Sequence, residues 1–523
     1  MRKPVFLSAL STLCSIIICS QPFPRYSLPD TNGIGQYISR TMHRLQYSDP
    51  LEKTTVKILF YGQSITAQDW WKDVKEDVEE RFPNAELIIE NRAIPGFHSD
   101  LLWRPVYFDV LPFYPDLVLF HVYGSLEKYE QIIQTIRQYT TAEVLLQSSH
   151  VHSNSGWFDQ MEKTEQPKLM EKYHIGQAKV RSEWQRYMQE HNITDTASLL
   201  KDNIHLNDSG LYLMSEIIKP YLYYKGYWPA DTDNTIKYIG INPGDWDEDT
   251  LIIPVVGNRA DIVMDNKAAF TNDKLAVFVD DHKPSEYPGT YKFTRPAHNN
   301  SCYVWCMPSF FYLRNNAPLL EENWTLTITE VSYDPIWLKF KLEGSKTGFD
   351  GTGTDTSDFV SNSGRVIIGK MDWYFNDTRK ITGLTVEPPY EITFKTIVQA
   401  VDEFEPVPRT DSTENTVCLF QGIANTGHVL KLVYPGNKET IKGIRAYRPY
   451  FQRDSVLRVK AGFNKTTFSA NGGTKEVTIS SNTLRTIVYA TEPWLVADTD
   501  TSYSSTFNLK IKVDANKGAE RAG

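Results

Sequence analysis

The sequence is poor in cysteine, has no excess of positive charge and lacks a long apolar run beyond its N-terminus. Its 523 residues include 5 cysteines without a second cluster at metal-ligand spacing, so we expect no metal site. In an oxidising compartment Cys302 and Cys306 could form a disulfide. The net charge of −9, without a long basic run, argues against nucleic acid as a partner. No later segment is long enough to cross a bilayer.

What remains is the composition of a globular chain with several domains. A length of 523 residues exceeds a single hydrophobic core and predicts about two to four domains. Hydrophobic residues make up 41% and charged residues 23%, which argues against a disordered chain. Aromatic residues reach 13%, and such rings bind sugars, although β-sandwich cores would explain most of them.

Residues 1–22 have the pattern of an export signal. Arg2 and Lys3 supply the charged start, and Val5 to Ile18 form the apolar core. This run ends at Cys19 and resembles a bacterial lipobox, but the residue before the cysteine is a bulky isoleucine. We therefore predict an exported chain, either lipid-anchored at Cys19 or released by ordinary signal cleavage.

Between residues 23 and 225, short apolar segments alternate with amphipathic helical patterns. The predicted strands are 56–61, 86–90, 116–122 and 143–147, and the predicted helices are 34–45, 69–82, 126–139, 168–190 and 209–222. This alternation is typical of an α/β domain with a parallel sheet that is covered on both faces. Functional sites in such sheets form where the strands end.

The helical periods vanish after residue 226, and an all-β region is predicted. Glycine, proline, asparagine and aspartate separate short β runs as far as residue 452, enough for one large sandwich or two small ones. Residues 344–363 are interpreted as a long surface loop. A third β unit is predicted over 453–523, with strands at 475–480 and 507–513.

One serine follows the first predicted strand, two positions after Gly62, which interrupts it. Ser64 would lie at the carboxyl end of that strand, where backbone N–H groups also point, and this is a suitable place for a nucleophile. The alternative is an ordinary turn or N-cap serine.

A second motif, Asp202 to His205, lies just before the last predicted helix of the α/β region. Asp202 could orient the ring of His205, which would supply the base and the carboxylate that a serine nucleophile needs. Alone, His205 is better explained as a structural histidine. Its combination with Ser64 favours a catalytic triad.

These segments resemble the signature blocks of the SGNH (GDSL-like) hydrolases. The corresponding blocks are Gly62-Gln63-Ser64-Ile65, Asn91 to Phe97, and Asp202 to His205. The resemblance implies a three-layer, flavodoxin-like α/β fold, a catalytic Ser64, and no cofactor. It also implies an oxyanion hole formed by the backbone N–H groups of Ser64 and Gly96.

Two positions depart from the pattern of that family. Gln63 replaces the usual aspartate before the serine, and Gly124-Ser125-Leu126-Glu127 stands where the family has Gly-x-Asn-Asp. Leucine has no side-chain donor, so another group must complete the oxyanion hole or activity has been lost. The candidates for that group are Ser125, Tyr123, His98, and His150 or His152. Of these, Ser125 is placed in the oxyanion hole, and Tyr123, His98 and His150 are expected to bind substrate.

The β regions add two further resemblances. Residues 226–452 resemble the β-sandwich companion of a set of exported bacterial proteins. Residues 453–523 resemble a BACON domain, common in glycan-degrading enzymes of gut Bacteroidetes, through 468–478, Trp494-Leu495 and 516–519. Because the chain stops where that domain should have a final strand, we expect a truncated or atypical unit.

Together these observations predict an exported SGNH-type serine esterase that deacetylates an acylated polysaccharide or oligosaccharide. Its expected location is the periplasm or the outer membrane of a Gram-negative bacterium. The alternative is a non-catalytic, glycan-binding surface protein with an inactive hydrolase domain, which Leu126 and Gln63 favour. An esterase for lipid or sulfated substrates is a third interpretation.

Overall fold

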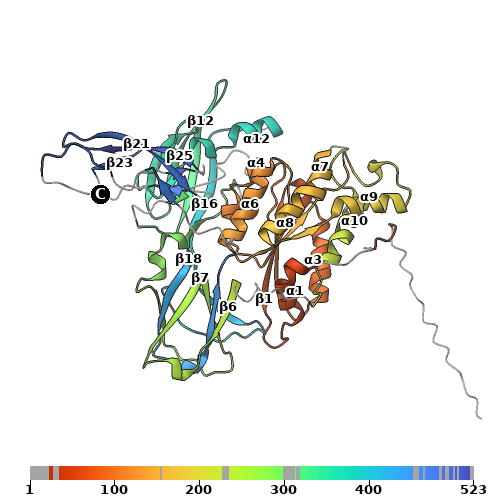
Figure 1. Cartoon of the computed structure of the whole chain (residues 1–523), viewed down its shortest axis with the longest axis horizontal. Helices are drawn as coiled ribbons and strands as arrows, with labels where there is room; N and C mark the ends of the chain where they lie inside the picture. The colour runs from red at the N-terminus through yellow and green to blue at the C-terminus, as the bar shows by residue number, and fades with distance from the viewer. Residues whose placement is uncertain are drawn as a thin grey trace, which may run out of the picture.

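The computed structural model describes residues 23–27, 34–152, 156–226, 235–298, 312–313, 318–383, 385–450, 459–462, 466–481, 486–488, 494–498, 501–502 and 506–518. The predicted export signal and the candidate disulfide Cys302–Cys306 lie outside these residues. Figure 1 shows an α/β part, coloured red to yellow, beside a β part coloured green to blue. The predicted combination of a parallel α/β sheet with antiparallel β sheets is thereby confirmed.

The α/β part is built on a five-stranded sheet in the order β2-β1-β3-β4-β5. Its strands are β1 (Thr55–Gly62), β2 (Glu86–Asn91), β3 (Leu117–His121), β4 (Glu143–Gln147) and β5 (Gly176–Ala178). All four neighbouring pairs are parallel, and this strand order is one of the two common in doubly wound sheets. The carboxyl ends of the strands therefore meet at one edge.

Helices cover both faces because the side chains of β1 alternate between two cores. Val56, Ile58 and Phe60 pack with α1 (Ser39–Gln46), α3 (Trp70–Arg81), α9 (Val180–Glu190) and α10 (Asp208–Ile218). Leu59 and Tyr61 pack with α4 (Ser99–Leu102), α5 (Val106–Asp109), α6 (Leu126–Tyr139) and α8 (Gln166–Tyr173). Shorter pieces are α2 (Ser64–Ala67), α7 (Gly156–Gln160) and the π-helical turn Met161–Glu165.

The prediction of one helix over residues 168–190 is wrong. The structure has α8, then strand β5, then α9 in this segment. His174 ends α8 with a left-handed conformation at φ 50°. A strand of only 3 residues is too short to interrupt the surrounding helical pattern visibly in the sequence.

The first part of the β region forms three antiparallel sheets. A six-stranded sheet contains β6 (Ile236–Gly240), β7 (Thr250–Met264), β8 (Leu275–Val279), β17 (Glu403–Phe404), β18 (Asn415–Val433) and β19 (Ile441–Tyr447). A five-stranded sheet contains β9 (Tyr291–Phe293), β11 (Glu322–Tyr333), β12 (Ile336–Gly344), β13 (Gly348–Thr354) and β16 (Tyr390–Val398). A small sheet contains β10 (Tyr312–Leu313), β14 (Phe359–Val360) and β15 (Val366–Ile368).

Two expectations for this region are wrong. The segment 344–363, expected to be a loop, contains strands β13 and β14, and its glycines are explained by packing. A Cβ on Gly353 would lie 2.6 Å from the ring of Phe340 and 2.7 Å from the ring of Phe359. The region is also not entirely β, because α12 (Phe375–Thr382) follows the small sheet.

The last described segments form a four-stranded sheet and a two-stranded sheet. The first contains β20 (Val459–Ala461), β21 (Gly473–Ser481), β23 (Leu495–Ala497) and β25 (Thr506–Val513), and the second pairs β22 (Thr486–Ile487) with β24 (Thr501–Ser502). The two strands predicted here correspond to β21 and β25, which pair antiparallel.

The β part packs closely against the face of the α/β part that carries α4, α5 and α6. One continuous apolar core joins this face to the five-stranded sheet and α12. Across the same interface, Tyr374 Oη donates a hydrogen bond of 2.9 Å to the carbonyl of Leu101. Arg295 forms an ion pair of 2.7 Å with the buried Asp109. The loops that leave the carboxyl end of β2 are therefore supported from outside the α/β part.

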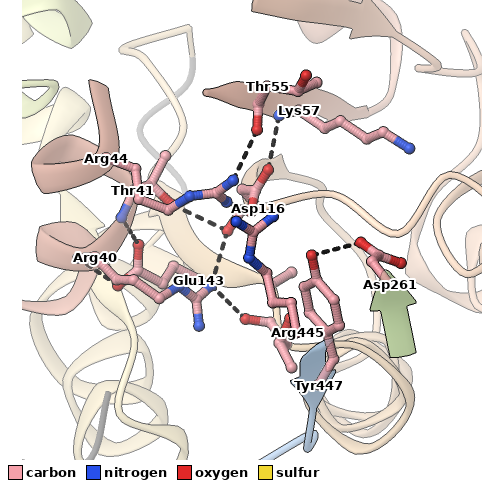
Figure 2. A network of polar contacts seen from close by, with 12 residues as sticks. Arg40, Thr41, Arg44, Thr55, Lys57, Asp116, Glu143, Asp261, Arg445 and Tyr447 are labelled. Atoms are coloured by element: carbon pink, nitrogen blue, oxygen red, sulfur yellow. Dashed lines mark hydrogen bonds and ion pairs between the residues drawn. The ribbon is translucent and has the colours of Figure 1, made fainter. Parts of the chain in front are cut away.

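A second contact lies at the opposite, amino-terminal edge of the parallel sheet (Figure 2). Glu143, the first residue of β4, accepts the backbone N–H groups of Arg40 and Thr41 at 3.0 and 2.8 Å. Asp116, just before β3, accepts the N–H of Lys57 at 2.8 Å. The same view contains Arg44, Asp261, Arg445 and Tyr447, the last three from the six-stranded sheet. This edge is filled by structural hydrogen bonds.

No helix among the described residues combines the length and the apolar character needed to span a bilayer.

Candidate active site

The end of β1 carries Ser64 to the carboxyl edge of the parallel sheet. Gly62 is the last residue of the strand, and Ser64 is the first residue of α2. A side chain at position 62 would collide with the carbonyl of His121 on β3 and with Thr66, so only glycine fits there. Gln63 is the N-cap of α2, and its side-chain oxygen accepts the N–H of Ile65. Ser64 thus takes the predicted position at a strand-to-helix turn.

Three side chains distant in sequence form one hydrogen-bonded series. His205 Nε2 lies 3.0 Å from Ser64 Oγ, and His205 Nδ1 lies 2.9 Å from Asp202 Oδ2. A carboxylate only accepts hydrogen bonds, so Nδ1 carries the proton and Nε2 of the neutral ring is the acceptor. This is the arrangement in which an imidazole can take the proton of a serine hydroxyl.

Asp202 is held in place by its own loop. Its Oδ1 accepts the backbone N–H groups of Ile204 and His205, both at 2.7 Å. The hydrogen bond from the His205 N–H lowers the pKa of Asp202 most, followed by the bond from the Ile204 N–H and then the bond from the His205 ring. Together they lower this pKa to about 2. The carboxylate, whose side chain is 51% exposed, is therefore ionised even at mildly acidic pH.

The hydroxyl of Ser64 has a second acceptor besides the imidazole. Gln63 Oε1 lies 2.8 Å from Ser64 Oγ, while His205 Nε2 lies 3.0 Å away. The single hydroxyl hydrogen can be donated to only one of them at a time. Proton transfer to His205 therefore requires the hydroxyl to rotate away from Gln63.

The loops that follow β2 and β3 lie on the two sides of Ser64. Ile94 N–H donates to the carbonyl of Gly62, and Gly62 pairs with His121 on the other side. A turn then runs from Ile94 to Phe97, closed by a 3.1 Å backbone hydrogen bond, with Gly96 at φ 79°. Positive φ at the third position is the signature of a type II turn. Gly96 lies two residues after Ile94, and Tyr123 lies two residues after His121, just as Ser64 lies two residues after Gly62.

Asp100 joins these two loops to each other. Its carboxylate accepts the N–H of Ser125 at 3.1 Å and the hydroxyl of Ser125, and it lies 3.0 Å from His98 Nδ1. Burial raises the pKa of Asp100, but the hydrogen bonds from Ser125 and His98 outweigh it and lower the pKa to about 2. The hydroxyl hydrogen of Ser125 is thus committed to Asp100, which argues against the predicted role of Ser125 as an oxyanion donor.

Leu126 occupies the position where the hydrolase family has asparagine. It is the first residue of α6, and its side chain packs against the apolar core. His98 and Tyr123 remain at the surface beside it. The two ring centroids are 6.1 Å apart, Tyr123 is 41% exposed, and the His98 side chain is 35% exposed. These two predicted substrate-binding residues are placed together and are accessible.

His150 is not accessible, and the prediction that it contacts substrate is not supported. It is 1% exposed, and its Nε2 lies 2.8 Å from the carbonyl of Ile204. Its ring packs between His152 and Trp184, with centroid distances of 5.0 and 5.4 Å. His152 in turn contacts Phe158 at 4.6 Å. His150 therefore contacts the loop that carries His205.

Gln68 is a site residue that the sequence did not indicate. Its side-chain oxygen accepts the N–H of Leu206 and its side-chain nitrogen donates to the carbonyl of Leu206, both at 3.0 Å. No sequence pattern distinguishes a glutamine that binds a distant backbone from an ordinary surface glutamine. Among the residues that the structure describes, no group of three or more His, Cys, Asp and Glu side chains could hold a metal ion.

No family model matches the sequence, and no curated protein matches it. Similar solved structures include a two-domain esterase active on acetylated mannans, with 11% identity, a TM-score of 0.31, and coverage of 80% of this chain and 97% of that one. An acetyl xylan esterase, AlAXEase, has 22% identity and a TM-score of 0.29 over 31% of this chain and 98% of its own. A protein described as a GDSL-like lipase from Parabacteroides merdae has 17% identity and a TM-score of 0.29 over 33% and 97%.

Proposed function

We propose that this chain is an exported serine esterase of the SGNH type, with a flavodoxin-like catalytic domain, that removes acetyl groups from a glycan. The observation that carries the proposal is the continuous series from Ser64 Oγ through the His205 ring to Asp202 Oδ2, with steps of 3.0 and 2.9 Å. Each step is of ordinary hydrogen-bond length, so rotation of the Ser64 hydroxyl from Gln63 toward His205 is the rearrangement that proton transfer needs.

In the proposed reaction, Ser64 Oγ attacks the acyl carbon while its proton passes to His205 Nε2. The imidazolium that forms is stabilised by the ionised Asp202 through Nδ1. His205 then donates the proton to the departing sugar hydroxyl. Water then attacks the acyl carbon while His205 takes one of its protons. The bond between that carbon and Ser64 Oγ breaks, His205 returns the proton to Oγ, and the acid is released.

The proposed oxyanion hole consists of the backbone N–H groups of Ser64 and Gly96. An asparagine donor is missing because position 126 is a leucine, whose side chain packs against the apolar core. Removal of one such donor typically costs about 10²- to 10³-fold in rate. We assign the neighbouring position to His98, whose Nδ1 lies 3.0 Å from Asp100 Oδ2 and whose Nε2 can donate to the oxyanion when the ring is the imidazolium.

A glycan substrate is supported by the open surroundings of the triad. The Asp202 and His205 side chains are 51% and 34% exposed, so a polymer can reach them without entering a deep tunnel. The half-exposed ring of Tyr123, next to His98 in the loop after β3, provides an apolar face at the same edge of the sheet. Residues 1–22 support export, and Cys19 supports a lipid anchor at the periplasmic side or outer membrane of a Gram-negative cell.

A second candidate function is a glycan-binding protein with an inert hydrolase domain. The specific observation in its favour is Leu126, together with the competing contact of Gln63 on the Ser64 hydroxyl. It predicts glycan binding without turnover.

Hydrolysis of 4-nitrophenyl acetate and acetate release from acetylated xylan and mannan test the proposal. Wild type should be active and Ser64→Ala inactive, while Ser332→Ala should match wild type. Ser332 is a suitable control because it lies in the β part and its hydroxyl donates to the nearby carbonyl of Pro335. Equal rates for wild type and Ser64→Ala would refute the esterase, and retention on an affinity gel would then favour the binding protein.

A further inference from the structure

The base of the proposed triad lies on a surface loop, which is a demanding position for catalysis. Ile204, directly before His205, is 46% exposed. A shift of about 1 Å in a reacting group can cost on the order of 10²-fold in rate. The short contacts to Asp202 fix the loop internally, but they do not fix it relative to Ser64. Contacts to the rest of the domain must do so.

The first such contact comes from the element that carries the nucleophile. Gln68 is the C-cap of α2, four positions after Ser64, and its backbone N–H bonds to the carbonyl of Ile65. The Gln68 side chain makes two hydrogen bonds of 3.0 Å to the backbone of Leu206, the residue after His205. One amide side chain therefore connects the nucleophile helix to the base loop through both a donor and an acceptor.

The second contact comes from the segment that follows β4. His150 Nε2 lies 2.8 Å from the carbonyl of Ile204, the residue before His205. A carbonyl only accepts, so Nε2 carries the proton and Nδ1 does not. His150 Nδ1 has no hydrogen-bond partner among the described residues, so the ring binds through Nε2 alone in this part of the structure. Burial also holds the pKa of His150 well below its usual value.

We infer that Gln68 and His150 are positioning residues that hold His205 at hydrogen-bond distance from Ser64. Each binds the backbone of one neighbour of His205, so the imidazole is fixed from both sides without being touched itself. This inference rests on the proposed esterase function. It assigns to His150 a role different from substrate contact, and it gives Gln68 a role that the hydrolase motifs do not include.

Gln68→Met tests the first contact, since methionine has a similar length but cannot make either hydrogen bond. We expect kcat for 4-nitrophenyl acetate to fall by roughly 10- to 100-fold with little change in KM. The reaction of Ser64 with an organophosphate ester should slow by the same factor, because it uses the same base. In the Ser64→Ala background the substitution should cause no further loss.

Gln399→Met is the matched control. Gln399 is also half-buried, donates through its side-chain amide to the carbonyl of Pro112 at 2.7 Å, and accepts a hydrogen bond from Gln421. Gln399 therefore contacts the segment before β3, at the edge of the sheet opposite to Ser64. It should lower the melting temperature to an extent similar to Gln68→Met and leave kcat unchanged.

His150→Phe tests the second contact, because phenylalanine keeps a ring against Trp184 but cannot donate to Ile204. We expect a loss in kcat of about 10-fold and the same slowing of organophosphate labelling.

Amide exchange of Leu206 should become faster in Gln68→Met only, because its N–H donates to Gln68. This measurement does not depend on activity and reports the contact directly.

The outcomes separate the inference from the proposed function. An active wild type together with unchanged kcat in both variants would overturn the positioning role. An inactive wild type would overturn the esterase. If the wild type is inactive, unchanged amide exchange of Leu206 in Gln68→Met would also overturn the contact between Gln68 and Leu206. Faster exchange would keep that contact as a purely structural one.

Discussion

The two edges of the parallel sheet use similar groups for different purposes. At the amino edge, Asp116 accepts the N–H of Lys57 and pairs with Arg44, and its side chain is 13% exposed. At the carboxyl edge, Asp202 also accepts backbone N–H groups, but its side chain is 51% exposed and it holds a histidine. Figure 2 shows that the amino edge is closed by the α1 helix and the six-stranded sheet.

The difference lies in what remains available after the carboxylates are satisfied. At the amino edge every partner of Glu143 and Asp116 drawn in Figure 2 belongs to the protein framework. At the carboxyl edge His205 Nε2 faces the hydroxyl of Ser64, which it can deprotonate. We therefore expect substitutions at the amino edge to change stability and those at the carboxyl edge to change rate.

The largest expected effect is the loss of turnover when the nucleophile or the base is removed. Ser64→Ala and His205→Ala should each lower kcat by about 10⁴- to 10⁶-fold, because the two groups act as one unit. The melting temperature should stay close to that of wild type, since both side chains are partly exposed. Steady-state kinetics and calorimetry of the purified variants measure the two effects. Activity retained in either variant would contradict the assignment.

Breaking a buried ion pair on the opposite side should give the reverse result. Asp261 accepts two hydrogen bonds of 2.9 Å from Arg259 and one of 2.7 Å from Tyr447, and its side chain is 5% exposed. Asp261→Ala leaves Arg259 buried without its carboxylate, so we expect a loss of about 3–5 kcal/mol in the free energy of unfolding. Urea denaturation measures this loss, and kcat per folded molecule should not change. A fall in kcat at full folding would contradict the separation of the two edges.

A smaller effect on rate is expected at His98. His98→Ala removes the ring that we place beside the oxyanion, so kcat should fall by about 10- to 100-fold. Leu126→Asn should not restore the rate, because the side chain at this position packs against the apolar core. Kinetics of the single and double variants test both statements. A gain in kcat for Leu126→Asn would show that position 126 still reaches the ester.

The smallest expected effect is on acid stability. The pKa values of Asp202 and Asp100 are both lowered to about 2, from a usual value of 3.8. A lowered native pKa stabilises the fold above the unfolded value and ceases to do so as the pH falls through the native value. The melting temperature of wild type should therefore fall slightly more between pH 4 and pH 2 than that of Asp100→Asn. Thermal scans across this range measure the difference, and parallel curves would contradict it.

Much of the α/β part follows from local patterns. The apolar run at 56–61 corresponds to β1, and the helical stripes over 69–82 and 126–139 correspond to α3 and α6. Such patterns survive because each element buries one side against the sheet. The three-residue strand β5 and the strands within 344–363 are too short, or too rich in glycine, to produce a period of their own.

Part of the site was predictable in the same way. Gly62-Gln63-Ser64 follows a strand, and Asp202 to His205 precedes a helix, so their chemistry could be read from type and order. Three features could not be predicted from the sequence: the bond of Ser125 to Asp100, the burial of His150, and the two hydrogen bonds of Gln68. Each depends on a segment distant in sequence, with no pattern linking the two.

The sequence by itself determined which residues can supply a nucleophile, a base and a carboxylate, because those capacities belong to the side chains. Only the tertiary structure decided that Ser64, His205 and Asp202 meet at hydrogen-bond distance. It also decided which neighbouring polar groups are already occupied by protein partners. Distances and hydrogen-bond partners arise from packing between strands and loops far apart in the chain, and that packing fixes what each group is free to do.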